Sequence, residues 1–319
     1  MRIVFFGTPT YVLPILEALH KKFRDGDKTP IVAVVTQSPK PTGRKQVVEY
    51  SAVDKWAHSR KIPTYYNPED LVKDAVSADF GVLESFGGIL SEKIINFFPH
   101  GILNAHPSLL PKYRGASPAQ ASILCGETTS GATIIKLDKF VDHGPIVWQF
   151  KEDVLVSDTA ESLRVRIFEK SVDVFINLID AYIKGKILLK EQNDNEAIMT
   201  WRIKKEEAFI PPKALEAATK AKDLPGEWKI DFIETPKGSY ETAYSPKSID
   251  QFIRAMSPWP QAWTFVKIKQ DTLRLKIIAA HLESTPKEDT KLVIDTVQLE
   301  GKNQVAWEQF VSGYKDFKF

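Results

Sequence analysis

The fold of this 319-residue chain is decided where an apolar run turns polar, in the stretch Gly101-Ile-Leu-Asn-Ala-His-Pro-Ser-Leu-Leu-Pro-Lys-Tyr-Arg-Gly115. The apolar start predicts a strand, and Pro107 ends it because proline cannot donate to a sheet ladder. Residues two apart on a strand face the same side, so Asn104 and His106 emerge together from its end. Ligands of open α/β sheets bind at that end of a strand. An isolated Asn-x-His pair is equally compatible with loop capping.

A second polar turn favours the functional interpretation. Asp142 lies in Asp138-Lys-Phe-Val-Asp-His-Gly144, between two apolar runs. A strand-turn-strand unit would expose Asp142 at its tip, where the carboxylate could orient His106 as the third group of a relay. Asp142 by itself would read as a plain Asp-x-Gly turn. An amide donor, an imidazole and a carboxylate together suit the attack of a nucleophile on a carbonyl carbon.

Short apolar runs alternate with amphipathic ones through the first half of the chain. Such alternation predicts βαβ units and a doubly wound, mostly parallel sheet of the α/β class. The predicted strands are 2–6, 31–36, 80–84, 101–105, 131–137 and 145–151, and the predicted helices are 11–23, 51–59, 91–98, 116–124 and 159–182.

The pattern of apolar and polar residues changes after a polar stretch that includes Glu191-Gln-Asn-Asp-Asn-Glu196. We therefore divide the chain into a catalytic domain at 1–184, a linker at 185–210 and a second domain at 211–319. Residues 248–255 predict a helix, and 262–268, 273–280, 291–299 and 307–319 alternate like strands of a small antiparallel sheet or barrel. The segment 211–244 is irregular and has no predicted element.

Composition excludes several classes of protein. The net charge of +2 leaves any nucleic-acid contact to a local patch. Cys125 is the single cysteine, which excludes a disulfide framework and a cysteine-based zinc site, and the six histidines have no metal-ligand spacing. No apolar run approaches membrane-spanning length. We expect a monomeric, cytoplasmic protein without a metal or a membrane partner.

Two loops have open interpretations. The loop Gln37-Ser-Pro-Lys-Pro-Thr-Gly-Arg-Lys45 is stiff and basic. A solvated surface is the default for such a run, and a finger that contacts phosphates is the functional alternative. The glycines of Phe86-Gly-Gly-Ile-Leu90 permit either close approach of a flat ligand or a sharp turn.

These motifs together resemble the methionyl-tRNA formyltransferase family, within the enzymes that use 10-formyltetrahydrofolate. The resemblance covers the first domain almost continuously and recurs in the second. It rests on Phe6-Gly-Thr-Pro9, Val35-Thr-Gln37, Pro41-x-Gly-Arg44, Phe86-Gly-x-Ile-Leu90, Asn104-x-His-x-Ser-Leu-Leu-Pro111, Arg114-Gly-Ala-x-Pro118, Gly131-x-Thr133, Asp138-x-x-x-Asp142-x-Gly144 and Pro258-Trp-Pro-x-x-Trp263.

The resemblance implies a Rossmann-like catalytic domain, an OB-like barrel that binds tRNA, and a role for each motif. Asn104 would steady the oxyanion, His106 would polarise the formyl carbonyl, and Asp142 would tune His106 and accept a proton through water. Reduced folate would bind Phe86, Gly87, Gly88, Ile89, Leu90, Ser108, Leu109, Leu110, Pro111, Val141 and Gly144. Methionyl initiator tRNA would meet Lys40, Arg44 and Lys45.

The chain also departs from the family. The residues after Arg44 are less basic than expected, and the region from Lys204 to Tyr244 resembles an insertion. Two other functions therefore stay open, namely N-formylation of an amino sugar nucleotide and a non-catalytic folate- or RNA-binding module. Intact Asn104, His106 and Asp142 argue against the module.

Overall fold

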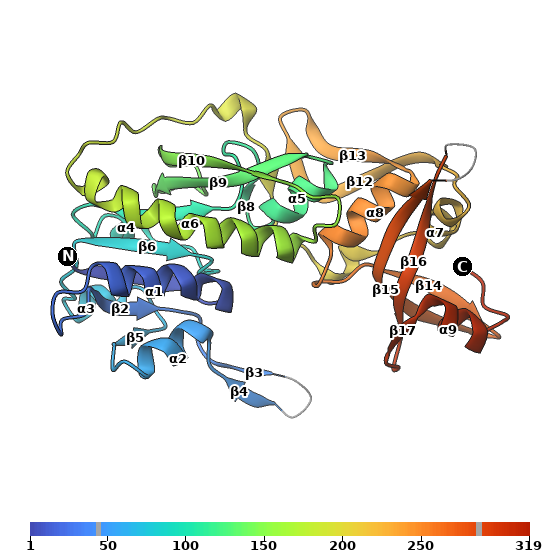
Figure 1. Ribbon diagram of the computed structural model, residues 1–319, viewed down its shortest axis with the longest axis horizontal. Helices are drawn as coiled ribbons and strands as arrows, with labels where there is room; N and C mark the ends of the chain where they lie inside the picture. The colour runs from blue at the N-terminus through green and yellow to red at the C-terminus, as the bar shows by residue number, and fades with distance from the viewer. Residues whose placement is uncertain (43–45, 285–288) are drawn as a thin grey trace. The chain divides into compact units, whose positions relative to one another are not determined.

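The computed structural model describes residues 1–42, 46–284 and 289–319, and the chain forms two compact units (Figure 1). The first unit contains Met1–Pro111, Gly131–Glu152 and Val165–Asp194. The second contains Lys112–Ser130, Asp153–Arg164 and Asn195–Phe319. The chain therefore crosses between the units several times. The linker predicted at 185–210 falls partly in each unit, and the predicted domain limits remain a proposal.

The first unit is built on a seven-stranded sheet of order β10-β9-β7-β6-β1-β2-β5. Neighbours from β7 to β5 pair in parallel, and β9 pairs with β7 in the antiparallel direction. The predicted mostly parallel sheet is confirmed. The strands are β1 (Ile3–Gly7), β2 (Ile31–Val35), β5 (Thr64–Tyr65), β6 (Phe80–Glu84), β7 (Ile102–His106), β9 (Thr129–Lys136) and β10 (Ile146–Asp153).

Both faces of this sheet are covered, which explains why its central strands are apolar at consecutive positions. Ile3 and Phe5 of β1 pack into one core, and Val4 and Phe6 pack into the other. The first core includes residues of α1 (Leu13–Lys22), α2 (Ala52–His58) and α6 (Ala160–Ile183), and the second those of α3 (Asp70–Lys73) and α4 (Glu92–Ile95). This confirms the doubly wound architecture.

A short hairpin follows β2. Its strands are β3 (Lys40–Thr42) and β4 (Val47–Glu49), which pair in the antiparallel direction. Lys40 is exposed. The predicted tRNA-binding residues Arg44 and Lys45 lie outside the described residues.

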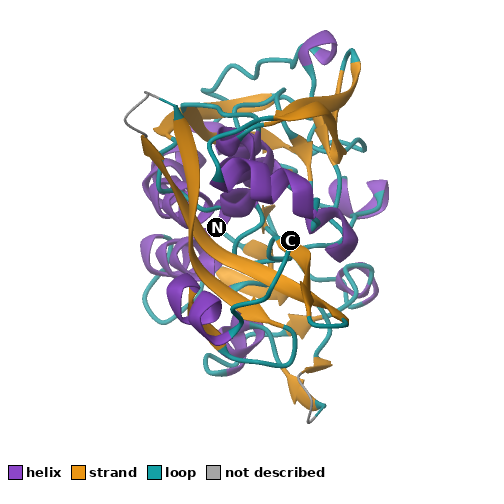
Figure 2. Cartoon of the chain, turned by 90° about the vertical axis from the view of Figure 1, so that its right-hand side faces the viewer, coloured by secondary structure: helices purple, strands orange, loops and turns teal. Residues whose placement is uncertain are grey.

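In the residues that the structure describes, the second unit contains two β-sheets and is rich in antiparallel pairs. One sheet joins β8 (Arg114–Gly115), β11 (Met199–Thr200), β12 (Leu224–Thr235) and β13 (Gly238–Tyr244). The other joins β14 (Trp263–Ile268), β15 (Asp271–Ser284), β16 (Thr290–Leu299) and β17 (Gln304–Ala306), each pair antiparallel. Their long strands are strongly twisted (Figure 2). The predicted β-rich second domain is confirmed.

The helices of the second unit include two that the sequence predicted and two that it missed. The helix predicted at 248–255 is α8 (Pro246–Ala255), which follows the cap Ser245. Residues 211–244, left without elements, form α7 (Pro212–Thr219), β12 and β13. The strand expected at 307–319 is wrong, because α9 (Trp307–Gly313) packs Phe310 against Trp307 and Tyr314 at helical spacing. The helix predicted at 116–124 is also confirmed, as α5 (Pro118–Leu124).

Candidate active site

The candidate site begins at the end of β7. Leu103 and Ala105 point into an apolar core, and the residues between and after them, Asn104 and His106, point to the other side. Both polar side chains are buried, with exposed fractions of 6% and 4%. Buried polar groups require partners, so their contacts define the site.

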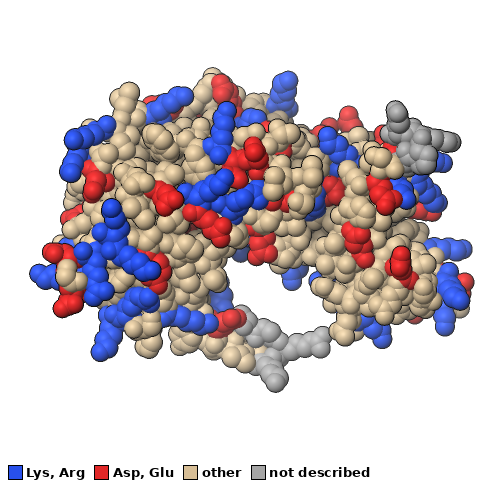
Figure 3. Space-filling view, viewed as in Figure 1, with Lys and Arg blue, Asp and Glu red and all other residues tan. Residues whose placement is uncertain are grey.

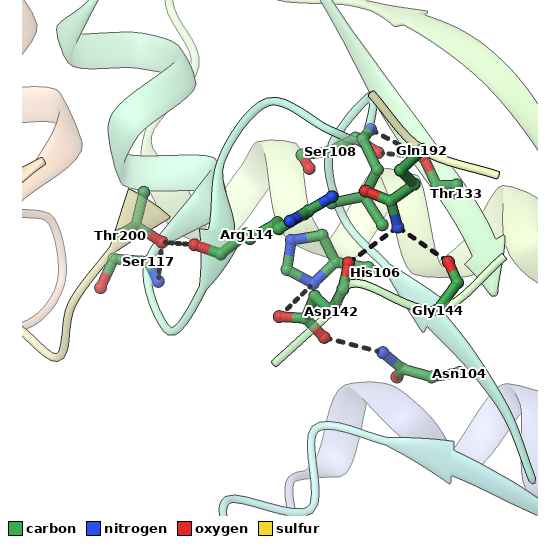
Figure 4. A network of polar contacts seen from close by, with 11 residues as sticks. Asn104, His106, Ser108, Arg114, Ser117, Thr133, Asp142, Gly144, Gln192 and Thr200 are labelled. Atoms are coloured by element: carbon green, nitrogen blue, oxygen red, sulfur yellow. Dashed lines mark hydrogen bonds and ion pairs between the residues drawn. The ribbon is translucent and has the colours of Figure 1, made fainter. Parts of the chain in front are cut away.

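The carboxylate of Asp142 meets both side chains. Its Oδ1 lies 3.4 Å from Nδ2 of Asn104, which donates to it, and its Oδ2 lies 3.4 Å from Nδ1 of His106 (Figure 4). These three residues, predicted from separate motifs, are therefore brought together. One carboxylate holds the amide and the imidazole in fixed relation, which is the arrangement an oriented acid–base site needs.

The loop that carries Asp142 folds back over the sheet. Strand β9 ends at Lys136, which pairs with Leu103 near the start of β7. The loop must therefore return along β7 for Asp142 to reach His106. Asp142 has φ 47°, a left-handed conformation that is uncommon outside glycine. The sequence predicted a turn here and did not predict this conformation.

A side chain that no sequence motif indicated supports this loop. The Nε2 group of Gln192 donates to the backbone oxygens of Asp142 and Gly144, each at 2.8 Å (Figure 4). Gln192 belongs to the polar stretch that was predicted as a linker. Its composition carried no signal for this contact, because solvated linkers are equally rich in amides.

The Ser108 to Pro111 segment is organised by Thr133, which lies opposite His106 on β9. Thr133 Oγ1 donates to the oxygen of Ser108 at 2.7 Å, and it accepts from the nitrogen of Leu110 and from Nε2 of Gln149. Ser108 and Leu110 are buried, whereas Leu109 and Pro111 are half-buried. The segment is thus a fixed wall with Leu109 and Pro111 as its more accessible side chains.

The Phe86 to Leu90 segment follows β6. The side chains of Phe86 and Leu90 are buried in the second core, whereas Ile89 is 91% exposed. Thr8 Oγ1 and Gln37 Nε2 both donate to the oxygen of Phe86. Gly87 has φ 79° and Gly88 is exposed, so these glycines form a sharp turn that presents Ile89 to solvent.

The Asp142 loop also presents apolar side chains. Phe140 is 58% exposed and Val141 is 51% exposed. Exposed apolar groups beside a polar site are typical of surfaces that a ligand covers. Gly144 lies where an added Cβ would come within 1.9 Å of the backbone oxygen of Lys136, so its small size has a steric reason of its own.

A buried acid lies beside the site. The Oε1 atom of Glu84 accepts from the backbone nitrogen of Ala105, between Asn104 and His106, at 3.1 Å. The side chain is fully buried, and Oε2 has no hydrogen-bond partner among the described residues. Burial raises the pKa of Glu84 well above its ordinary value. The sequence placed Glu84 at the end of a strand and gave it no role.

In the described part of the chain, no three His, Cys, Asp or Glu side chains are grouped so that they could hold a metal ion. Within the same residues, no helix has the length and apolar character required to cross a bilayer.

The comparison with protein families decides the identity of this site. Residues 1–179 match the formyl transferase model, and residues 244–291 match the model for the C-terminal domain of formyl transferases. The chain belongs to the formyl transferase family. Asn104, His106 and Asp142 all lie within the first match.

Individual relatives cover nearly the whole chain. A methionyl-tRNA formyltransferase of Methylacidiphilum infernorum is 33% identical over 98% of this chain and 95% of its own length. That of Thermus thermophilus is 29% identical over 94% of this chain and 86% of its own.

Solved formyltransferases share the fold. The N-formyltransferase of Helicobacter canadensis, solved with folinic acid and dTDP-3-aminofucose, has a TM-score of 0.63 and 18% identity, covering 92% of this chain and 98% of its own. The methionyl-tRNA formyltransferase of Clostridium thermocellum has a TM-score of 0.55 and 17% identity, covering 94% and 98%. The two-domain fold is therefore shared by formyltransferases that act on different acceptors.

Proposed function

We propose that this formyltransferase moves the formyl group of 10-formyltetrahydrofolate to the α-amine of methionyl initiator tRNA, a reaction of translation initiation in the cytoplasm. The observation that carries the proposal is the meeting of Asn104, His106 and Asp142 through one carboxylate. This set contains a neutral donor, a proton carrier and a base, which are the groups that acyl transfer to an amine requires.

In the proposed reaction the amine nitrogen attacks the formyl carbon and forms a new C–N bond. Asn104 donates to the oxygen that becomes negatively charged, and His106 polarises the same carbonyl. Asp142 accepts, through water, the proton that the amine loses. The bond from the formyl carbon to N10 then breaks and N10 gains a proton, so one proton moves from the amine to N10 overall.

The donor site is proposed at the loops beside these residues. Ile89 and Val141 present exposed apolar side chains, and Leu109 adds a half-buried one. Such groups suit the flat ring system of a reduced folate. We assign the donor to the residues that the family resemblance selected, with Ser108, Leu110 and Gly144 shaping the backbone around it.

The tRNA acceptor is supported by relatives that bear that name and by one face of β14 and β15. Trp263, Phe265 and Lys267 share a face of β14. On β15, Lys276 lies directly opposite Trp263, and Arg274 lies directly opposite Phe265. Phe265, Lys267 and Arg274 are exposed. Basic groups interleaved with aromatic rings favour the phosphates and bases of RNA. We propose that the region 211–319 binds tRNA through this face, defined by these five residues and called the aromatic-basic face.

The test is to incubate the protein with 10-formyltetrahydrofolate and either methionyl initiator tRNA or a dTDP-linked amino sugar. Formylation of the tRNA is expected. Formylation of the sugar alone would replace the proposed acceptor, and binding of folate or RNA without product would indicate a non-catalytic module.

The catalytic residues are tested in the same assay. Asp142→Asn and His106→Ala should each lower kcat by about 100-fold or more, the range of a lost acid–base group. Folate binding, followed by quenching of intrinsic fluorescence, should persist. A variant of either residue with near-normal kcat would refute its assigned role.

A further inference from the structure

The polar stretch after α6 reaches the candidate site through Gln192. Its Nε2 group lies 2.8 Å from the oxygen of Asp142 and 2.8 Å from the oxygen of Gly144. An amide NH2 has two hydrogens, so one side chain can donate to both carbonyl groups at once. The two carbonyls flank residue 143, and Gln192 therefore bridges the backbone on both sides of the turn.

The backbone at this turn needs such support. Asp142 has φ 47°, a left-handed conformation that residues other than glycine adopt only at a cost in free energy. A strained residue keeps its conformation when surrounding contacts over-determine it. The carboxylate contacts Asn104 and His106 at 3.4 Å each, at the long end of hydrogen bonding, so a small change in the backbone would break them.

A second contact fixes the same turn from the same stretch. The Nδ1 atom of His143 lies 2.6 Å from Oδ2 of Asp138, and its Nε2 atom lies 3.4 Å from Oδ2 of Asp194. Asp138 also accepts from the backbone nitrogen of Phe140 at 2.9 Å. Residues 192 and 194 thus contact the turn at its backbone and at a side chain, which leaves Asp142 little freedom to move.

We propose that Gln192 is a positioning residue for formyl transfer, which acts by holding Asp142 in the conformation that meets Asn104 and His106. This inference rests on the proposed function for its reaction. Gln192 touches neither substrate in this role. The stretch predicted as a linker is then part of the catalytic apparatus, and its effect on turnover passes entirely through Asp142.

The experiment is a double-mutant cycle between Gln192→Met and Asp142→Asn. Methionine keeps the length of glutamine and removes both donors without adding charge. Gln192→Met should lower kcat by about 10-fold or more, as loss of a group that orients a reacting side chain does, with the folate affinity unchanged. In the Asp142→Asn background the same change should have no further effect, because the group that Gln192 holds has already lost its function.

The control is Glu191→Gln, which alters the exposed neighbouring residue and should keep wild-type kcat. Hydrogen exchange of the peptide covering 138–144 provides a readout that does not depend on turnover. Gln192→Met should speed its exchange, and Glu191→Gln should not.

The outcomes separate this inference from the proposed function. Faster exchange with unchanged kcat, or equal fold losses from Gln192→Met in both backgrounds, would overturn the positioning role. Unchanged exchange would overturn the holding contact itself. Wild-type turnover in Asp142→Asn would instead refute the proposed role of Asp142, whatever the exchange rates are.

Discussion

The carboxyl group of Glu84 links the chemistry of one residue to the stability of the fold. Its pKa is raised by burial, so the folded protein keeps a proton that the unfolded chain releases as the pH rises above the ordinary value of a glutamate. The folded state then binds more protons than the unfolded state. Stability that is fully present at acid pH is therefore lost as the pH rises toward the folded pKa.

Glu84→Gln should remove this dependence. The amide keeps an oxygen that can accept from Ala105 and carries no charge at any pH. Above pH 5, we expect the free energy of unfolding of the variant to rise relative to that of the wild type by up to about 1.4 kcal/mol for each pH unit. Urea titrations between pH 5 and 8 measure this difference. Parallel stability curves would contradict the raised pKa.

At the level of single residues, the sequence predicted correctly that the side chains of Asn104 and His106 lie on one side of their strand. Strand periodicity placed Asn104 and His106 on one side, and the structure places them there. Gln192 and Glu84 were missed for two reasons. Gln192 makes its contact over 50 sequence positions, and Glu84 ends an apolar strand where no pattern distinguishes a buried acid from an exposed one.

At the level of helices and strands, the periodicity of apolar residues predicted some features of the fold and not others. The alternation of βαβ units predicted the central sheet, because both faces of each strand are buried. It could not predict the return of the 138–144 loop along β7, which depends on the register of Leu103 with Lys136. It also mistook α9 for a strand, since a short run rich in aromatic residues fits either period.

The turn between β9 and β10 gives a prediction at this scale. A Cβ on Gly144 would lie 1.9 Å from the oxygen of Lys136, and backbone cannot yield as a flexible side chain can. Gly144→Ala should therefore force this turn open and destabilise the protein by about 1–3 kcal/mol or more. Thermal unfolding by circular dichroism measures the loss.

Gly313→Ala is the matched control for this prediction, because an added Cβ there meets no atom within 4 Å. It should change stability by no more than about 0.5 kcal/mol. Equal stability of the two variants would contradict the steric reason for Gly144. If Gly144→Ala unfolds more readily than the wild type, a loss of activity in this variant would reflect the opened turn. It would then not measure contacts between Gly144 and folate.

The whole molecule has little net charge with which to attract RNA. The formal charge is +2, and positive and negative side chains are interspersed on the face in Figure 3. Attraction of the tRNA backbone must then come from a local surface, since dispersed charges of both signs are screened beyond about 10 Å at moderate salt. The aromatic-basic face supplies such a surface, with Lys267 and Arg274 exposed on it.

We therefore expect the double variant Lys267→Gln and Arg274→Gln to raise the KM for methionyl initiator tRNA, with folate affinity unchanged. If each side chain neutralises one phosphate, the slope of log affinity against log salt should fall by about 2. Lys21→Gln with Lys22→Gln is the matched control, because it removes the same charge from exposed positions at the end of α1. Equal losses in both double variants would assign the effect to net charge. Wild-type KM and salt slope in the first would mean that tRNA contacts another surface, whereas a loss confined to it would place recognition of the acceptor on β14 and β15.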